Sequence, residues 1–262
     1  MAGMGVFRRR RQASPGSLET MTIAVNPNAF HEVDGRLPRL LRSLWPARCL
    51  ACGESGHAGR DLCLACARAL PWNGDACPSC ALPLPSPAPA CGTCLRRAPP
   101  LDALHAAFGY ARPLDRLLPR FKFHGDLAAG RLLAQWMTDA CALLPRPDAL
   151  IPIPLHASRL RTRGYDQALE LARPLARALG LPLHGKVLQR LRATAPQSEL
   201  NALARRRNVR NAFAVRDGVA LPAHVVLVDD VMTTGATLHA AAKVLRRAGV
   251  QRIDAWVCAR VA

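Results

Sequence analysis

The chain has 262 residues, half of them hydrophobic, and a formal net charge of +18. This length has room for one good-sized domain and a small accessory domain. No apolar run approaches the roughly eighteen residues that a membrane helix needs, and no apolar segment follows the early arginines as it would in a secretory signal. The composition therefore argues against an integral membrane protein, and we expect a cytoplasmic one.

The positive charge is carried almost entirely by arginine. Only three of the 36 basic residues are lysine, and alanine is abundant. A strong positive charge favours a polyanion such as nucleic acid as partner. A bias toward arginine and alanine is also typical of proteins encoded by GC-rich genomes, so the charge alone leaves both explanations open.

Residues 1–35 contain a run of four arginines and show no hydrophobic periodicity, which predicts a disordered tail. A solvated tail and a basic arm that contacts nucleic acid are the two interpretations, and Met21 is an alternative start. Residues 37–46 place leucines and a tryptophan on one helical face, which predicts an amphipathic helix. We expect this helix to pack on a neighbouring domain, with a position on a membrane surface as the alternative.

Eight of the ten cysteines form four C-x-x-C pairs that recur every fourteen residues. One pair places two thiolates on a tight turn, and two pairs complete a tetrahedral site for Zn²⁺. Because sulfur would fill every coordination position, we expect two structural zinc ions that stabilise the fold. Disulfides or an iron–sulfur cluster are the alternatives. The predicted ligands are Cys49, Cys52, Cys63, Cys66, Cys77, Cys80, Cys91 and Cys94.

This segment resembles a double zinc ribbon, and with the preceding helix it forms a predicted small domain at residues 36–98. Consecutive C-x-x-C pairs are the favoured partners, with a cross-braced arrangement as the alternative. His57 lies between two pairs, and we expect it to be solvated rather than a ligand.

Strand and helix patterns alternate through residues 99–262. This alternation predicts an α/β domain with a mostly parallel sheet and helices on both faces. Cys141 and Cys258 fall on this pattern as core thiols. The predicted strands are 105–110, 149–154, 225–228 and 252–257, and the predicted helices are 114–123, 126–144, 166–179 and 238–248.

An arginine-rich loop is predicted directly after the strand at 149–154. It carries Arg159, Arg161 and Arg163. Guanidinium groups in this position would complement a pyrophosphate through bidentate, charge-assisted hydrogen bonds. A solvent-exposed basic turn is the alternative.

Residues 225–237, with the sequence V-V-L-V-D-D-V-M-T-T-G-A-T, join a buried strand to the start of a helix. Asp229 and Asp230 can accept hydrogen bonds from neighbouring sugar hydroxyls or hold a divalent cation. Turn amides and threonine hydroxyls suit a phosphate, and Gly235 permits close approach of a ligand. The alternative is an ordinary strand-turn-helix in which these groups only cap the helix.

The same stretch resembles the phosphoribosyl pyrophosphate (PRPP) binding motif of type I phosphoribosyltransferases. The resemblance implies that Asp229 and Asp230 hold the ribose hydroxyls, and that the turn cradles the 5′-phosphate. It also implies that Mg²⁺ accompanies PRPP. The PRPP-binding residues expected on these grounds are Asp229, Asp230, Thr233, Thr234, Gly235, Ala236, Thr237, Arg159 and Arg163.

Five stretches occur in one order: P-x-R-C-L-x-C at 46–52, F-K-F-H-G-D at 121–126, R-L-R-x-R-G-Y-D-Q-A within 152–168, T-x-x-Q-x-x-L at 194–200 with Arg205, Asn208 and Phe213, and the acid-pair motif. As an ordered set they resemble the ComF (ComFC) family, in which a zinc ribbon precedes a phosphoribosyltransferase-like domain. The chain has R-G-Y-D-Q where that family commonly has R-G-F-N-Q. This departure leaves Asp166 in doubt as a ligand.

The resemblance implies a PRPP-binding protein that is accessory to the handling of single-stranded DNA in natural transformation. Its implied partners are PRPP, single-stranded DNA and a helicase-like ATPase, and its place is the cytoplasm or the inner face of the membrane. An active phosphoribosyltransferase in base salvage and a PRPP-sensing regulator are the alternatives. No signature in the sequence identifies an acceptor substrate or a catalytic residue.

Overall fold

The computed structural model describes residues 47–192 and 211–262 of the chain, and these belong to one compact unit. The predicted tail at 1–35, the predicted helix at 37–46 and most of the polar stretch at 192–213 lie outside the described residues. The predicted boundary between a ribbon domain and a larger domain near residue 98 remains a prediction.

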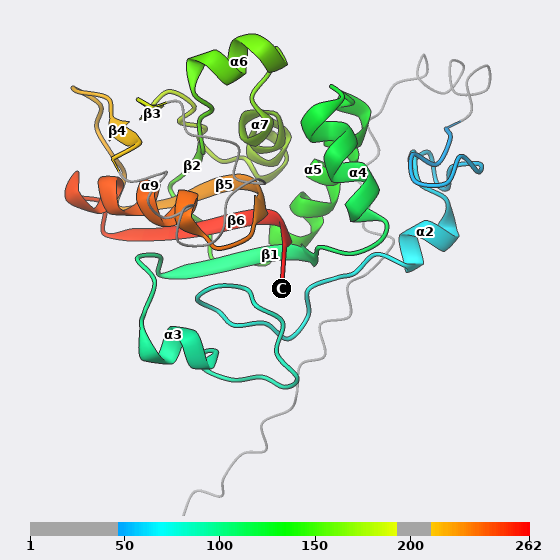
Figure 1. The fold of residues 1–262 in the computed structure, drawn as a ribbon, viewed down its shortest axis with the longest axis horizontal. Helices are drawn as coiled ribbons and strands as arrows, with labels where there is room; N and C mark the ends of the chain where they lie inside the picture. Colours follow the sequence, from blue (N-terminus) through cyan, green and yellow to red (C-terminus); the bar gives the residue numbers. More distant parts are fainter. Residues whose placement is uncertain (1–46, 193–210) are drawn as a thin grey trace, which may run out of the picture. The chain divides into compact units, whose positions relative to one another are not determined.

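The centre of the described fold is a four-stranded sheet in the order β1-β6-β5-β2, with every neighbouring pair parallel (Figure 1). Parallel sheets need cover on both faces, which is why their strands are nearly continuously apolar. The strands are β1 (Ala103–Gly109), β2 (Ala149–Pro152), β5 (His224–Met232) and β6 (Arg252–Arg260).

Helices cover the two faces of this sheet and enclose two cores. Val226 and Val228 of β5 face one core, whereas Val225 and Leu227 face the other. This alternation confirms the predicted fold class of a mostly parallel sheet with helices on both faces. The first core contains α4 (Leu114–Phe123), α5 (Leu127–Cys141) and α7 (Gln167–Leu179), and the second contains α9 (Ala236–Arg247).

Local side chains explain where the two longest helices begin. Asp126 Oδ1 accepts a hydrogen bond from the Ala129 amide at 3.0 Å, and Asp166 Oδ1 accepts one from Leu169 at 3.1 Å. These N-caps satisfy amides that have no partner inside the helix. Among the helices that the structure describes, none has both the length and the apolar character needed to cross a bilayer.

The prediction of a loop after β2 is wrong about its secondary structure, because the arginine-rich segment forms a helix, α6 (Ala157–Arg163). The His156 ring accepts a hydrogen bond from the Ser158 amide at 3.2 Å and caps its start. Gly164 ends it with a φ of +82°, a left-handed conformation that glycine adopts without strain.

Two further differences come from pairing between distant segments. β5 continues past the predicted end at residue 228, since β6 pairs with it as far as Met232 opposite Arg260. A separate antiparallel pair joins β3 (Leu188–Arg190) to β4 (Phe213–Val215), which the periodicity did not predict.

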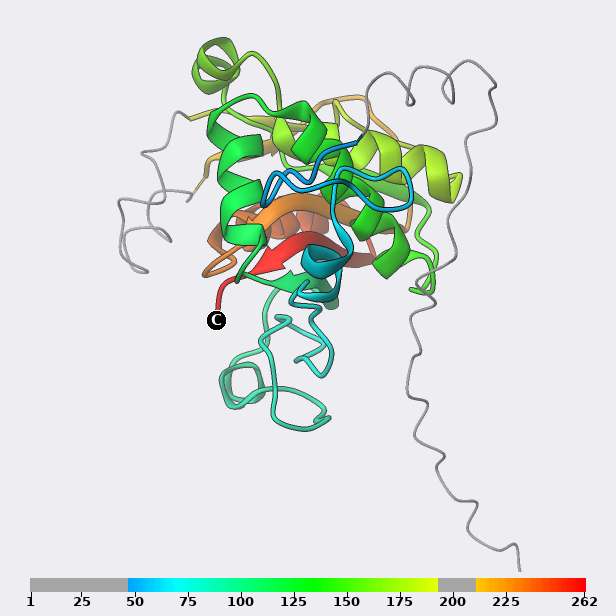
Figure 2. The same ribbon diagram turned by 90° about the vertical axis from the view of Figure 1, so that its right-hand side faces the viewer.

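The cysteine-rich segment packs against the sheet and its helices (Figure 2). Its helices are short, α2 (Leu64–Arg68) and α3 (Gly92–Arg96). Leu62 joins the core under α4 and α5, and the Trp72 and Phe108 rings lie 4.6 Å apart. The cysteine-rich segment therefore extends the core of the larger domain.

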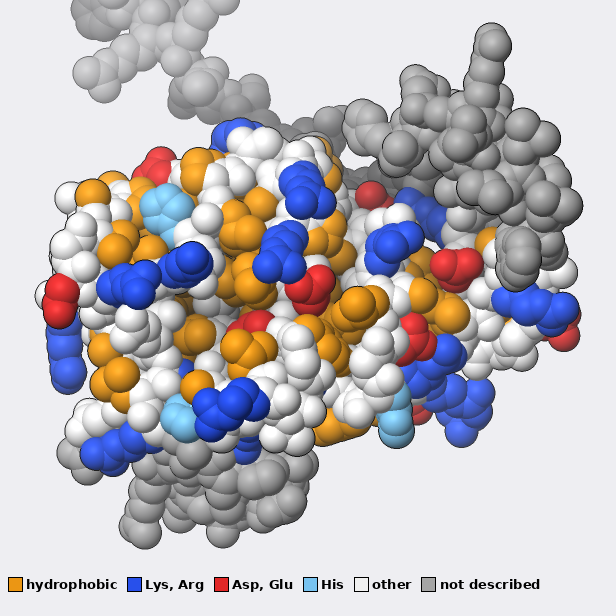
Figure 3. All heavy atoms as spheres, turned by 90° about the horizontal axis from the view of Figure 1, so that it is seen from above, with side chains coloured by type: hydrophobic (Ala, Val, Ile, Leu, Met, Phe, Trp, Pro, Cys, Tyr) orange, Lys and Arg blue, Asp and Glu red, His pale blue; other side chains and the backbone are white. Residues whose placement is uncertain are grey.

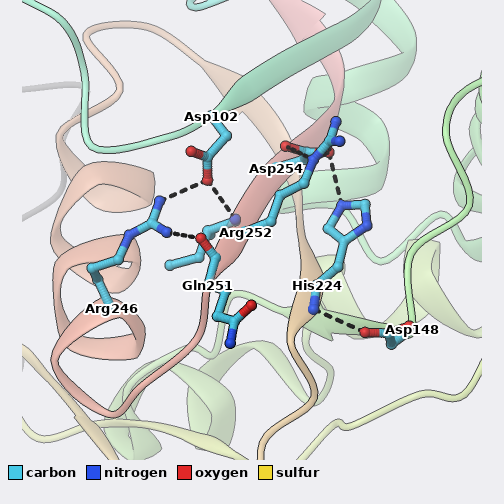
Figure 4. A network of polar contacts seen from close by, with 8 residues as sticks. Asp102, Asp148, His224, Arg246, Gln251, Arg252 and Asp254 are labelled. Atoms are coloured by element: carbon cyan, nitrogen blue, oxygen red, sulfur yellow. Dashed lines mark hydrogen bonds and ion pairs between the residues drawn. The ribbon is translucent and has the colours of Figure 1, made fainter.

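The face that carries α6 and α7 is seen from above in Figure 3, where hydrophobic side chains are exposed together with Lys and Arg side chains at their border. The amino-terminal ends of the strands carry a network of acids and bases, which Figure 4 shows in detail.

This network centres on Asp254, which is buried at the start of β6. Its Oδ2 lies 2.8 Å from His224 Nε2 and 3.0 Å from Arg252 Nη2 (Figure 4). Nearby, Asp102 Oδ2 accepts from the Ile253 amide at 2.7 Å and lies 2.6 Å from Arg246 Nη2. The buried carboxylate of Asp254 needs such partners, and the network links the starts of neighbouring strands.

Replacing Asp254 by alanine should lower the free energy of unfolding by about 2–3 kcal/mol, because it leaves two bases without their buried acceptor. Urea denaturation measures this loss. Asp217→Ala removes an exposed acid and should change stability by less than about 0.5 kcal/mol. Equal midpoints for the two variants would contradict a structural role for Asp254.

Candidate functional site

A cavity of about 560 Å³ opens beyond the carboxyl ends of β2 and β5. Ligands bind at this edge in open α/β sheets, because loops there diverge and leave a crevice. The walls come from the end of α4, from α6 and from the turn between β5 and α9. The acid pair and the arginine-rich segment are more than sixty residues apart in the sequence, and both line this cavity.

The acid pair lies on the cavity wall within β5. Asp229 Oδ1 accepts from the Asp230 amide at 2.9 Å, and Asp230 Oδ1 accepts from the Val231 amide at 2.7 Å. Removal from solvent, followed by the charge of Asp230, raises the pKa of Asp229. Such a pair favours any ligand that brings hydroxyl donors or a cation.

The turn after β5 has the form expected of a phosphate cradle. Thr233 and Thr237 line the cavity, and Gly235 has a φ of +72° immediately before α9. A Cβ at Gly235 would lie 2.6 Å from the methyl carbon of Met232. The first amides of α9 have no acceptor within the helix, and a helix start of this kind is a common place for an anion.

The other predicted turn residues do not line the cavity. Thr234 lies in the same turn and Ala236 begins α9, and the buried Thr234 hydroxyl has no hydrogen-bond partner among the described residues. Gly235 acts through its conformation rather than through a side chain. The predicted set is therefore divided between residues that face the cavity and residues that shape it.

Helix α6 presents two of its arginines to the cavity. Arg159 and Arg163 are four residues apart, which places them on one helical face, and both line the wall. Arg161 lies between them in sequence and does not line it. The Arg163 guanidinium carbon lies 5.6 Å from the centre of the Phe123 ring, within cation–π range.

The structure explains the aspartate at position 166, where the resembled family commonly has asparagine. Its Oδ2 accepts from the Leu155 amide at 2.8 Å while its Oδ1 caps α7. A carboxylate accepts with both oxygens, so Asp166 fixes the chain at both ends of the segment that carries α6. Asp166 is absent from the residues that line the cavity.

Several cavity residues escaped the sequence analysis. Lys122 Nζ lies 2.9 Å from Asp230 Oδ2, and the carboxylate raises the pKa of Lys122 although burial lowers it. Arg190 of β3 and the partly exposed rings of Tyr110 and Phe123 also line the wall. Lys122 and Phe123 belong to the F-K-F-H-G-D stretch, and this stretch was the feature of the sequence that could have identified them as site residues.

The eight C-x-x-C sulfurs gather into two groups, and within each group they lie within 4.8 Å of one another. Consecutive pairs are the partners, not cross-braced ones. His57 is exposed and belongs to neither group, and the other two cysteines, Cys141 and Cys258, are buried in the core. The groups are Cys49, Cys52, Cys63 and Cys66, and Cys77, Cys80, Cys91 and Cys94.

The spacing of these sulfurs fits zinc and not disulfides. Cys52 Sγ and Cys63 Sγ are 3.6 Å apart, and Cys80 Sγ and Cys91 Sγ are 3.7 Å apart. Four sulfurs at 2.3 Å from a tetrahedral ion are separated by about 3.8 Å, whereas a disulfide bond measures about 2.0 Å. The two tetrads therefore fit two structural zinc ions.

The pKa values of these cysteines shift in both directions. Burial raises the pKa of Cys49, but backbone N–H groups outweigh it and lower the pKa to about 6. Burial and neighbouring thiols raise the pKa of Cys66 and Cys94. Four thiolates cannot share so small a space unless a cation offsets their charge.

Helix α4 contacts both the first cysteine tetrad and the cavity. Arg116 Nη1 donates to the Ala51 carbonyl at 3.4 Å, and Arg120 donates to the Leu50 carbonyl. Both carbonyls lie between Cys49 and Cys52 of the first knuckle. The end of the same helix presents Lys122 to Asp230.

Comparison with known proteins agrees with this arrangement. Residues 40–95 match the family model of a double zinc ribbon domain, and residues 166–262 match that of a phosphoribosyl transferase domain. Competence protein F of Haemophilus influenzae is 39% identical over 174 residues, covering 63% of this chain and 76% of the relative.

Two further relatives carry related names. DNA utilization protein YhgH of Salmonella typhi is 38% identical, covering 63% of this chain and 75% of its own length. Competence protein ComFC of Streptococcus pneumoniae is 27% identical, covering 59% of this chain and 67% of its own length. The named relatives are thus two competence proteins and a DNA utilization protein.

Metal analysis of the purified chain should find about two zinc ions per molecule. Cys77→Ser should reduce this to about one, because it removes a sulfur from the second tetrad only. Cys141→Ala, which changes a core thiol outside both tetrads, should leave the content at about two. Unchanged zinc in the Cys77 variant would exclude the second site.

Proposed function

Because the chain belongs to the ComF family, we propose that it binds PRPP with Mg²⁺ in the cavity beyond β5 and acts as an accessory protein in the handling of single-stranded DNA. One observation carries the proposal. The acid pair, the threonine-rich turn and two arginines of α6 line one cavity, although they come from distant parts of the sequence.

Each group of PRPP has a complementary partner on the cavity wall. Asp229 and Asp230 would accept hydrogen bonds from two neighbouring ribose hydroxyls, and the turn at the start of α9 would bind the 5′-phosphate. Arg159 and Arg163 would bind the pyrophosphate. Mg²⁺ prefers carboxylate and phosphate oxygens, so the acid pair and the ligand would hold it together.

The role in DNA handling rests on charge and on the names of the relatives. The chain carries a formal net charge of +18, and its exposed basic residues offer many sites for phosphates. Aromatic residues make up only 5% of the chain, so phosphate contacts should outweigh base stacking. A helicase-like ATPase is the proposed protein partner, in the cytoplasm or at the inner face of the membrane.

An active phosphoribosyltransferase is the second candidate, and two aromatic residues in the lining of the cavity favour it. Beyond the acid pair, Tyr110 and Phe123 supply partly exposed aromatic surface on the same wall. A planar acceptor could stack there and attack the ribose carbon as pyrophosphate departs. Release of pyrophosphate in the presence of a base or amine separates this candidate from simple binding.

Calorimetric titration with PRPP and Mg²⁺ tests ligand binding. Asp230→Asn should weaken binding at least tenfold, because the buried carboxylate loses its charge beside the hydroxyls or the cation. Asp217→Asn, an exposed change away from the cavity, should bind as the wild type does. If the wild type gives no heat of binding at millimolar PRPP, the proposed ligand is wrong.

Affinity for single-stranded DNA should fall steeply with salt. Each phosphate that an arginine neutralises contributes about −0.7 to the slope of log affinity against log salt. Fluorescence anisotropy with a labelled oligonucleotide between low and physiological salt measures this slope. Absent binding at low salt, or a slope near zero, would argue against a DNA-handling role.

A further inference from the structure

Lys122 forms an ion pair that joins two elements far apart in the sequence. Its ammonium nitrogen lies 2.9 Å from Asp230 Oδ2 and 3.2 Å from Asp230 Oδ1. The Asp230 side chain is 7% exposed, whereas that of Lys122 is 33% exposed and lines the cavity. The Lys122 side chain therefore keeps part of its surface on the cavity while its ammonium pairs with the acid.

Residues between α6 and the start of α7 hold the backbone at Lys122 in place. The Tyr165 hydroxyl donates to the Phe121 carbonyl, and Gln167 Nε2 donates to the Lys122 carbonyl at 3.4 Å. The Phe121 and Tyr165 rings lie 5.8 Å apart. The turn that follows Arg163 thus positions the last turn of α4.

The other side of α4 is held by the cysteine-rich segment, through the contacts of Arg116 and Arg120 with the first knuckle. Arg120 is fixed in turn by Asp126, with Nη2 and Oδ2 2.6 Å apart. A helix held on both sides loses little further freedom when its terminal side chain binds a ligand. Lys122 is therefore held in position before a ligand binds.

Electrostatics gives this position a consequence. Two adjacent carboxylates repel an anionic ligand. A carboxylate and a phosphate about 4 Å apart repel each other strongly unless water or a cation screens their charges. In PRPP the pyrophosphate is attached to the carbon next to the one that bears the first ribose hydroxyl. A cation beside an acid that binds this hydroxyl lies close to the pyrophosphate as well.

We propose that Lys122 is a binding residue of this site, which offsets the charge of Asp230 and donates to the anionic, pyrophosphate-bearing side of the bound sugar. The proposal rests on the proposed PRPP site and adds a residue to it. An ammonium has three donors, so Lys122 can keep its bond to Asp230 and still donate to a phosphate oxygen. The phosphoribosyl transferase match begins at residue 166 and does not include Lys122.

Titrations with PRPP and with ribose 5-phosphate, each with Mg²⁺, test this role. Lys122→Met should weaken PRPP binding at least tenfold and ribose 5-phosphate binding by a smaller factor, since the latter lacks the pyrophosphate. Lys122→Arg should restore most of the lost affinity. Lys186→Met removes an exposed lysine outside the cavity and should behave as the wild type.

A merely structural lysine would lower the affinity for both ligands by the same factor, and that result would overturn the proposal. Lys122→Gln keeps a hydrogen-bond donor without the charge, and it serves if the methionine variant does not fold. If Lys122→Met and Lys122→Gln bind PRPP as the wild type does while Asp230→Asn does not, Lys122 is excluded but the PRPP site stands. No PRPP binding by the wild type would overturn both.

Discussion

The candidate site depends on one property of the sheet, which is that β5 is paired on one side for longer than on the other. β2 ends at Pro152 opposite Val228, whereas β6 pairs with β5 as far as Met232. Asp229 and Asp230 therefore lie on a strand that β6 still pairs, with no neighbouring strand on the β2 side among the residues that the structure describes. Pairing with β6 fixes the position of their carboxylates, and the open β2 side lets a ligand reach them. Ligand sites in open α/β sheets require this arrangement.

The other parts of the site follow from this edge. The chain leaving β2 turns into α6 and brings Arg159 and Arg163 to the cavity, while Asp166 secures this segment through two backbone amides. α4 completes the wall with Lys122 and contacts the first cysteine tetrad with its arginines. The zinc-fitting segment thus contributes to the position of a cavity wall, although its sulfurs leave no position for chemistry.

Local patterns in the sequence were sufficient for the features that arise within a short stretch. The C-x-x-C spacing favoured the pairing of consecutive knuckles that the structure shows, the caps at Asp126 and Asp166 mark helix starts, and the acid-pair motif contains a strand, a turn and a helix start in sequence. The ion pair between Lys122 and Asp230 could not be predicted in this way, because it depends on how α4 packs against the end of β5. The β3–β4 pair and the extension of β5 also depend on distant partners, and α6 depends on caps that resemble ordinary loop residues.

The most direct test of this account is a crystal structure of the chain with PRPP and Mg²⁺. The account predicts ribose hydroxyls against Asp229 and Asp230, the 5′-phosphate at the start of α9, and the pyrophosphate within reach of Arg159, Arg163 and Lys122. A ligand bound elsewhere, or a cavity in which the acid pair touches no part of the sugar or its metal ion, would contradict it.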